Sequence, residues 1–185
     1  MNKNVAILTT NGFEEIELTS PMKALKDAGV TVHIVSPQKG EVKAWNDGNW
    51  SKSYKVDKHI SDARVEDYHA LLLPGGVINP DQLRTDEDSI NFIKDFFKHK
   101  KPVSAICHGL QSLINAEVVE GRKVTSYHSI RKDLENAGAH WVDQEVVVDQ
   151  GFTTSRNPDD LPAFNKKVLE ELREGKHDRQ LRNFK

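Results

Sequence analysis

The sequence is poor in cysteine and lacks the common motifs for metals and phosphates. Only one of its 185 residues is cysteine, so it cannot form an internal disulfide. It contains no Cys-x-x-Cys pair, no His-x-x-x-His pair with a nearby acid, and neither of the glycine-rich phosphate loops. The sequence therefore predicts no dedicated metal site and no bound cofactor.

Excess charge and long apolar runs are also missing. Lysine and arginine number 26 against 28 acidic residues, a net charge of −2, and no basic face is interleaved with aromatics, so we expect no obligate nucleic-acid partner. The first apolar run, residues 5–8, is too short for a signal-peptide core or a membrane span. We expect a cytoplasmic protein without membrane contact. Its single domain covers residues 1–175, and a polar tail at 176–185 is expected to be frayed.

Short apolar runs alternate with helical patterns along the chain. We predict strands at 5–10, 30–36, 69–73, 103–106 and 122–127, and a hairpin of two strands at 145–155. Helices are predicted at 20–28, 86–99, 129–137 and 159–173. The first helix is expected to begin at Ser20-Pro21, because serine favours the N-cap and proline the first turn. Asp47-Gly48 lies between alternating residues and predicts a small β-hairpin excursion. The fold class is therefore α/β, a flavodoxin-like three-layer sandwich with a mainly parallel central sheet and helices on both faces.

The one thiol, Cys107, falls where a predicted strand turns into a helix. A helix N-terminus favours the thiolate, and Gly109 leaves room for a substrate to approach the backbone. A lone cysteine is more often a small buried hydrophobe, but the turn and the adjacent His108 favour a nucleophile. Side chains next to each other on a tight turn usually diverge, so a surface role for His108 stays open beside a role as proton carrier.

Three unusual loops are predicted to meet at the carboxyl ends of the strands, where ligands bind in open parallel sheets. They contain Glu14, the pair Gly75-Gly76, and Cys107. Burial beside a thiolate would keep Glu14 protonated and donating to the sulfur, whereas the alternative is a solvated acidic helix start. Gly75 and Gly76 would supply N–H groups to an oxyanion, or form only a turn.

At these positions the chain resembles the PfpI intracellular proteases, part of the ThiJ/PfpI superfamily with its class I glutamine amidotransferase-like fold and its parkinsonism-associated deglycases. The motifs are Asn-Gly-Phe-Glu-Glu-Ile-Glu at 11–17, Leu-Pro-Gly-Gly at 73–76, Ala-Ile-Cys-His-Gly at 105–109, Thr-Ser-Tyr at 125–127 and Glu-Val-Val-Val-Asp at 145–149. Two positions depart from the family pattern. Leu110 replaces a common proline, and Asn157 replaces a histidine, which leaves no later His-x-Glu of the amidotransferase type.

The resemblance implies a catalytic role for Cys107 as nucleophile, for His108 as its general acid and base, and for Glu14 as the protonated carboxyl. It implies that Gly76 donates to the oxyanion and that Tyr127 lines the pocket. Asp81 is implied to reach the histidine from a neighbouring subunit. The site would then lie at the interface of a homodimer, and higher oligomers occur in the family.

The function implied is that of a stress-related cysteine hydrolase acting by thiolate attack on a carbonyl or acyl carbon. Its substrate would be a peptide, or methylglyoxal and its adducts in a deglycase or glyoxalase reaction, and a small shared pocket favours the dicarbonyl. A rival function is a non-enzymatic oxidative-stress sensor whose Cys107 is oxidised to sulfinic acid. A scaffold with an inert thiol of ordinary pKa is the third alternative.

Overall fold

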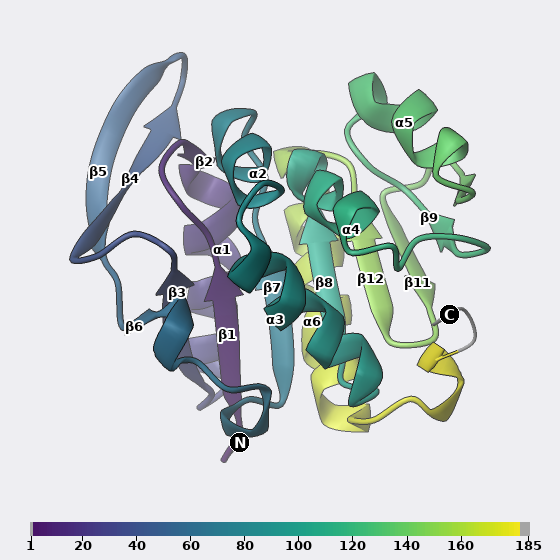
Figure 1. Ribbon diagram of the computed structural model, residues 1–185, viewed down its shortest axis with the longest axis horizontal. Coiled ribbons are helices and arrows are strands. Elements are labelled where there is room, and N and C mark those ends of the chain that lie inside the picture. Colours follow the sequence, from purple (N-terminus) through teal and green to yellow (C-terminus); the bar gives the residue numbers. More distant parts are fainter. Residues whose placement is uncertain (1, 182–185) are drawn as a thin grey trace.

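A seven-stranded sheet forms the centre of the computed structural model, which describes residues 2–181 (Figure 1). Its strands are β1 (Asn4–Leu8), β3 (Thr31–Ser36), β6 (Lys58–His59), β7 (Ala70–Leu73), β8 (Val103–Ile106), β11 (Val146–Asp149) and β12 (Phe152–Ser155). The spatial order is β11-β12-β8-β7-β1-β3-β6, and every pair is parallel except β11 with β12. The five principal parallel strands thus follow the flavodoxin-like order 2-1-3-4-5, which confirms the predicted fold class.

Helices cover both faces of this sheet (Figure 1). On one face lie α1 (Glu15–Asp27) and α6 (Leu161–Glu174), and on the other lie α2 (Ile78–Leu83), α3 (Glu87–Lys98) and α4 (Gln111–Asn115). Successive side chains of a strand point to opposite faces. Ile7 therefore packs in the core beneath α1 and α6, whereas Leu8 packs in the core beneath α3 and α4. Burial on both faces explains why the central strands are apolar almost throughout.

The first helix begins earlier than predicted. It starts at Glu15, and Pro21 lies inside it rather than in its first turn, so the prediction of a start at Ser20 was wrong. The early start of the helix is explained by a strand pairing between segments that are distant in the sequence. The preceding residues form β2 (Phe13–Glu14), which pairs with a strand from the hairpin and leads directly into the helix.

The predicted hairpin is present as β4 (Glu41–Asn46) and β5 (Asn49–Lys55). Asp47 and Gly48 join the strands at φ values of 48° and 74°, as a two-residue hairpin turn requires. Because β2 pairs with β4, the hairpin belongs to a three-stranded sheet. This attachment fastens it beside the loop that follows β1.

The remaining elements are short. The predicted strand at 122–127 is reduced to β9 (Lys123–Val124), which pairs with β10 (His140–Trp141) in a separate small sheet next to α5 (Arg131–Asn136). Tight 3-10 turns occur at Ile60–Asp62, Val65–Asp67, Cys107–Leu110, His128–Ile130, Pro158–Asp160 and Asp178–Leu181. Within residues 2–181, no helix has the length and apolar character needed to cross a bilayer.

The described part of the tail, residues 176–181, is packed rather than frayed. The N–H of His177 donates to the carbonyl of Lys100 at 2.9 Å, and the buried side chain of Gln180 donates to the carbonyl of Lys101 at 2.9 Å. Buried Arg122 donates to the carbonyl of Gln180. The polar composition of the tail gave no indication of these hydrogen-bond partners, which lie far away in the sequence. Residues 182–185 lie outside the described part of the chain.

Candidate active site

The three predicted loops meet at the carboxyl ends of β1, β7 and β8, which are neighbours in the sheet. They enclose a cavity of about 560 Å³. It is lined by Gly12, Glu14, Glu17, Trp45, Gly76, Val77, Ile78, Cys107, His108, Tyr127, Ser129 and Pro158. Residues from the hairpin and from the loop after β12 complete the walls that the three loops begin.

Cys107 occupies a strained turn between β8 and the 3-10 turn that follows. Its φ is 62°, a left-handed value that is unfavourable for a residue with a side chain. Two glycines allow the surrounding backbone to close in. A Cβ at Gly75 would lie 2.8 Å from the Cβ of Cys107, and a Cβ at Gly109 would lie 2.7 Å from the carbonyl oxygen of Leu73. The packing of the β7 and β8 loops therefore holds the sulfur in position.

The carboxyl beside the sulfur belongs to Glu17. Glu17 is fully buried in the first turn of α1, its Oε2 accepts the N–H of Gly75 at 2.8 Å, and its carboxyl lies near enough to the Cys107 thiol for each group to affect the pKa of the other. Burial raises the pKa of Glu17 to about 8. Glu14, which was expected in this position, is only partly buried and lines the cavity further out. Burial also raises the pKa of Glu14, with smaller effects from Glu15 and Asp47.

The thiol does not have the lowered pKa expected of a helix N-terminus. Burial raises the pKa of Cys107, and the neighbouring Glu17 charge raises it further. The N–H groups of Gly76 and His108 donate toward the sulfur and offset part of this effect. The helix dipole is weak here because a 3-10 turn precedes a helix of only five residues. Two buried acids in contact resist double ionisation, so Cys107 and Glu17 titrate as a pair.

His108 faces its own neighbour, contrary to the expected divergence. Its Nδ1 lies 3.2 Å from the Sγ of Cys107, and its Nε2 lies 3.1 Å from the Oγ of Ser129. The ring stacks on Tyr127 with centroids 4.7 Å apart. Burial lowers the pKa of His108, helped by nearby His128, so the imidazole is neutral at physiological pH and can accept the thiol proton.

Ser129 is a site residue that the sequence did not reveal. A histidine that accepts a proton at Nδ1 carries its own proton on Nε2, and the Ser129 hydroxyl is placed to accept it. The serine comes two residues after Tyr127 in a 3-10 turn. No spacing rule connects a serine there to Cys107, which lies more than twenty residues earlier.

The fold and these motifs agree with the comparison to known proteins. The model of the DJ-1/PfpI family matches residues 3–171. This chain belongs to the DJ-1/PfpI family. It is 47% identical over 173 residues to "Putative cysteine protease YraA" of Bacillus subtilis, covering 94% of this chain and 100% of that protein. It is 46% identical over 170 residues to "Protein/nucleic acid deglycase 2" of Escherichia coli, covering 91% and 97%.

A solved structure extends the comparison to three dimensions. The DJ-1/ThiJ/PfpI-like part of a two-domain protein from Anabaena variabilis, which also has a ferritin-like domain, superimposes with a TM-score of 0.87 at 33% identity. The match covers 92% of this chain and 48% of the two-domain chain, so this DJ-1/PfpI chain spans about half of that protein.

Of the other residues expected in the site of this DJ-1/PfpI chain, two line the cavity and two do not. Gly76 lines the cavity, whereas the N–H of Gly75 is already bound by Glu17. Tyr127 lines the cavity as expected. Asp81 is exposed on α2 and does not line the cavity of its own chain. Its proposed action across a subunit interface stays a prediction.

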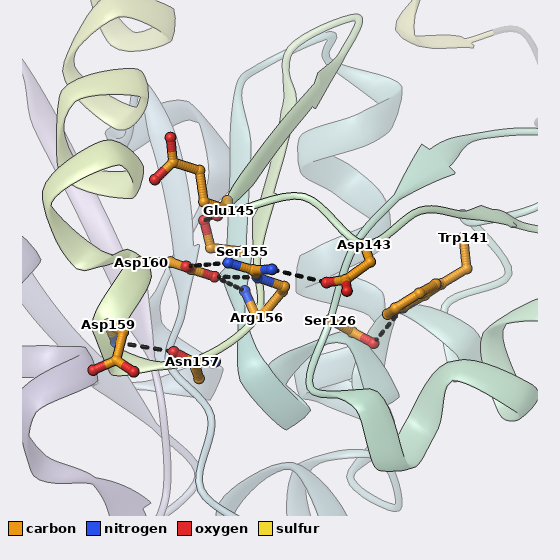
Figure 2. A network of polar contacts seen from close by, with 9 residues as sticks. All are labelled: Ser126, Trp141, Asp143, Glu145, Ser155, Arg156, Asn157, Asp159 and Asp160. Atoms are coloured by element: carbon orange, nitrogen blue, oxygen red, sulfur yellow. Dashed lines mark hydrogen bonds and ion pairs between the residues drawn. The ribbon is translucent and has the colours of Figure 1, made fainter.

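The loop after β12 is braced by the pair Asp143 and Asp160 (Figure 2). Arg156 contacts both, with its Nη1 2.8 Å from Asp143 and its Nη2 2.8 Å from Asp160. Asn157, at the position where the family often has histidine, accepts the N–H of Asp159 at 3.0 Å and is not among the residues that line the cavity. These ion pairs hold the loop in which Pro158 lines the cavity.

Proposed function

We propose that this chain is a cysteine-dependent enzyme whose Cys107 attacks the carbonyl carbon of small dicarbonyls, such as methylglyoxal, and of their adducts. The observation that carries the proposal is the 3.2 Å contact between the Cys107 Sγ and the His108 Nδ1, inside a cavity that also holds protonated Glu17. A relative named as a cysteine protease and another named as a deglycase support attack by sulfur on a carbonyl or acyl carbon.

The first step needs only groups that surround the sulfur. Because the pKa of the thiol is raised and that of the imidazole is lowered, His108 takes the thiol proton as the sulfur attacks, while protonated Glu17 and the N–H of Gly76 stabilise the charge that develops on sulfur. The sulfur bonds to the aldehyde carbon, and the carbonyl electron pair moves onto its oxygen, which receives the proton held by His108. The product of this step is a hemithioacetal.

The second stage converts this adduct into an acid without an external oxidant. His108 removes the proton from the carbon bonded to sulfur and returns it to the neighbouring carbon, and the hydroxyl proton of the hemithioacetal passes to the neighbouring carbonyl oxygen. The carbon bonded to sulfur is thereby oxidised to a carbonyl as its neighbour is reduced to an alcohol. The resulting thioester is attacked by water, the carbon–sulfur bond breaks, and the sulfur recovers a proton. Methylglyoxal plus one water gives lactate.

The cavity favours a compact substrate over a polypeptide. The aromatic rings of Trp45 and Tyr127 are part of its lining, and its volume of about 560 Å³ is of the size that holds small molecules. None of the described residues that line it is lysine or arginine. A neutral dicarbonyl needs no such cation, whereas a substrate carboxylate would lack a partner.

The test is lactate formation from methylglyoxal by the purified protein. We expect the wild type to turn over and Cys107→Ala to form no lactate, because the carbon–sulfur bond cannot form. A peptide panel run in parallel should give no cleavage. Equal and negligible turnover of methylglyoxal by both proteins would reject the glyoxalase reaction, and peptide cleavage that depends on Cys107 would favour the peptidase.

A sensor role has one observation in its favour, because the donors around the Cys107 sulfur would also hold a sulfinate. Two equivalents of hydrogen peroxide supply the two oxygen atoms of the sulfinate and are themselves reduced to water. Mass spectrometry and sizing of the oxidised protein separate the roles. A sensor should change its assembly on oxidation at Cys107, whereas an enzyme should lose only turnover.

A further inference from the structure

A second group of ligand atoms lies at the end of the sheet away from the cavity. Glu171 and Glu174 stand one turn apart at the end of α6, and His177 follows in the tail. Their carboxylate oxygens and imidazole nitrogen all lie within 4.8 Å of one another. In Figure 1 this end of α6 is at the bottom of the molecule, whereas the arrowheads of β1 and β8 point to the top. The group is therefore separate from the thiol site.

One member of this group is a buried carboxylate without a hydrogen bond. Glu171 is 6% exposed, and its Oε2 has no hydrogen-bond partner among the described residues. The Nε2 of His177 lies 2.9 Å away and likewise has no hydrogen-bond partner there. The two atoms are within ion-pair distance, but they do not meet the angle that a hydrogen bond requires. A buried carboxylate without hydrogen bonds is costly, and a cation shared by the two atoms would compensate for that cost.

The spacing of the two atoms fits a shared metal ion. Two ligand atoms bound at about 2.1 Å to one zinc ion lie about 3.4 Å apart in a tetrahedral site and about 3 Å apart at a right angle in a six-coordinate site. The 2.9 Å between Glu171 Oε2 and His177 Nε2 matches the six-coordinate value and would have to widen slightly for a tetrahedral ion. Glu174 is exposed, and its carboxylate oxygen lies within 4.8 Å of the other two atoms. It can therefore supply a third ligand atom from the solvent side.

The imidazole is held in place independently of Glu171. The backbone N–H of His177 donates to the carbonyl of Lys100 at 2.9 Å. Its ring packs against Gly151, which has a φ of 82° and where a Cβ would lie 2.5 Å from the Cδ2 of His177. The ring therefore needs no large rearrangement to act as a ligand.

We propose that Glu171, Glu174 and His177 bind one divalent transition-metal ion of the zinc type, with water completing its coordination. Two carboxylates and an imidazole suit zinc, whereas magnesium and calcium prefer oxygen ligands alone. The ion would neutralise the buried carboxylate and fasten the tail to α6. Glu174 and His177 lie beyond residues 3–171, the part of this chain that the family model matches.

The proposal is tested by zinc titration of the full chain carrying Cys107→Ser, because the thiol is itself a zinc ligand. Calorimetry should show one zinc per chain, and saturating zinc should raise the thermal unfolding midpoint, whereas magnesium should do neither. Adding Glu174→Gln should weaken zinc binding by about tenfold or more. Glu174 is exposed, so this variant is expected to fold.

Glu170→Gln is the matched control, since Glu170 is on the same helix but pairs with Lys167. It should leave zinc binding unchanged. His177→Gln should abolish both zinc binding and the zinc-dependent stabilisation. If Cys107→Ser binds no zinc, or if Glu174→Gln and Glu170→Gln bind zinc equally well, the site does not exist and Glu171 with His177 is only an ion pair. None of these measurements reads turnover, so they are independent of the proposed function.

Discussion

Cys107 and Glu17 share one buried space, and the proton between them decides how reactive the sulfur is. Burial disfavours the charged form of each group, and the charge of either disfavours that of the other. With Glu17 protonated, its O–H can donate to the sulfur and compensate for the lost hydration. The strained turn at Cys107 is therefore only part of the site, and the acid that completes it comes from α1.

The raised pKa of Glu17 predicts a pH-dependent stability. In the folded protein the pKa is about 8, against 4.5 as the ordinary value, so between these limits the folded state binds more protons than the unfolded state. The contribution is complete below about pH 4.5 and is lost as the pH rises toward 8. The free energy of unfolding should therefore fall over this range by on the order of a few kcal/mol.

Glu17→Gln should remove this slope, because the amide stays neutral while its oxygen can still accept the N–H of Gly75. Denaturant unfolding of both proteins at a series of pH values measures the difference. Glu14→Gln is the control, since Glu14 is less buried and should retain most of the slope. Parallel pH profiles for the wild type and Glu17→Gln would show that Glu17 is ionised in the folded protein.

At the scale of elements, the β4–β5 hairpin acts as a wall of the cavity. Trp45 lines the cavity, and the edge of its ring system meets Trp50 with centroids 5.3 Å apart and planes at 84°. Trp50 is 49% exposed and does not line the cavity. The parallel pairing of β2 with β4 couples this wall to the loop that supplies Glu14.

Trp45→Ala should therefore impair substrate retention without harming the thiol. We expect kcat/KM for methylglyoxal to fall about tenfold, an effect of ~1.4 kcal/mol, mainly through KM. Alkylation of Cys107 by iodoacetamide should be as fast as in the wild type or faster, because the cavity is more open. Trp50→Ala should behave as the wild type in both assays. An unchanged kcat/KM in Trp45→Ala would remove the hairpin from the binding site.

The elements also show what the sequence can and cannot predict. Apolar runs and turn residues identified the central strands, the hairpin and the Cys107 turn, because those signals are local. The start of α1 was missed since the pairing of β2 with β4 outweighed the local preference of Ser20-Pro21. That error hid Glu17, whose burial follows only once the helix begins at Glu15. Ser129 and the packed tail depend on contacts between distant segments, which no local pattern encodes.

At the scale of the whole molecule, a second subunit would be the source of an acid that assists His108. Among the residues that the structure describes, the hydrogen-bond partner of the His108 Nε2 is the Ser129 hydroxyl, at 3.1 Å, and Asp81 is exposed on α2. Val77, which lines the cavity, is 65% exposed. Val77 and Asp81 are both at or near the start of α2, so a partner subunit that covered Val77 would also meet Asp81.

If Asp81 acts across a dimer interface, two inactive variants should complement each other. Asp81→Asn keeps Cys107 but lacks the acid, and Cys107→Ala keeps the acid but lacks the nucleophile. After the two are mixed in equal amounts and allowed to exchange subunits, half of the dimers are mixed, and each mixed dimer has one complete site. Lactate formation should then reach roughly one quarter of the wild-type value. Sizing in solution must show a dimer at the assay concentration. A mixture no more active than the mean of its two components would mean that Asp81 does not serve the partner's histidine, and that Ser129 alone orients His108.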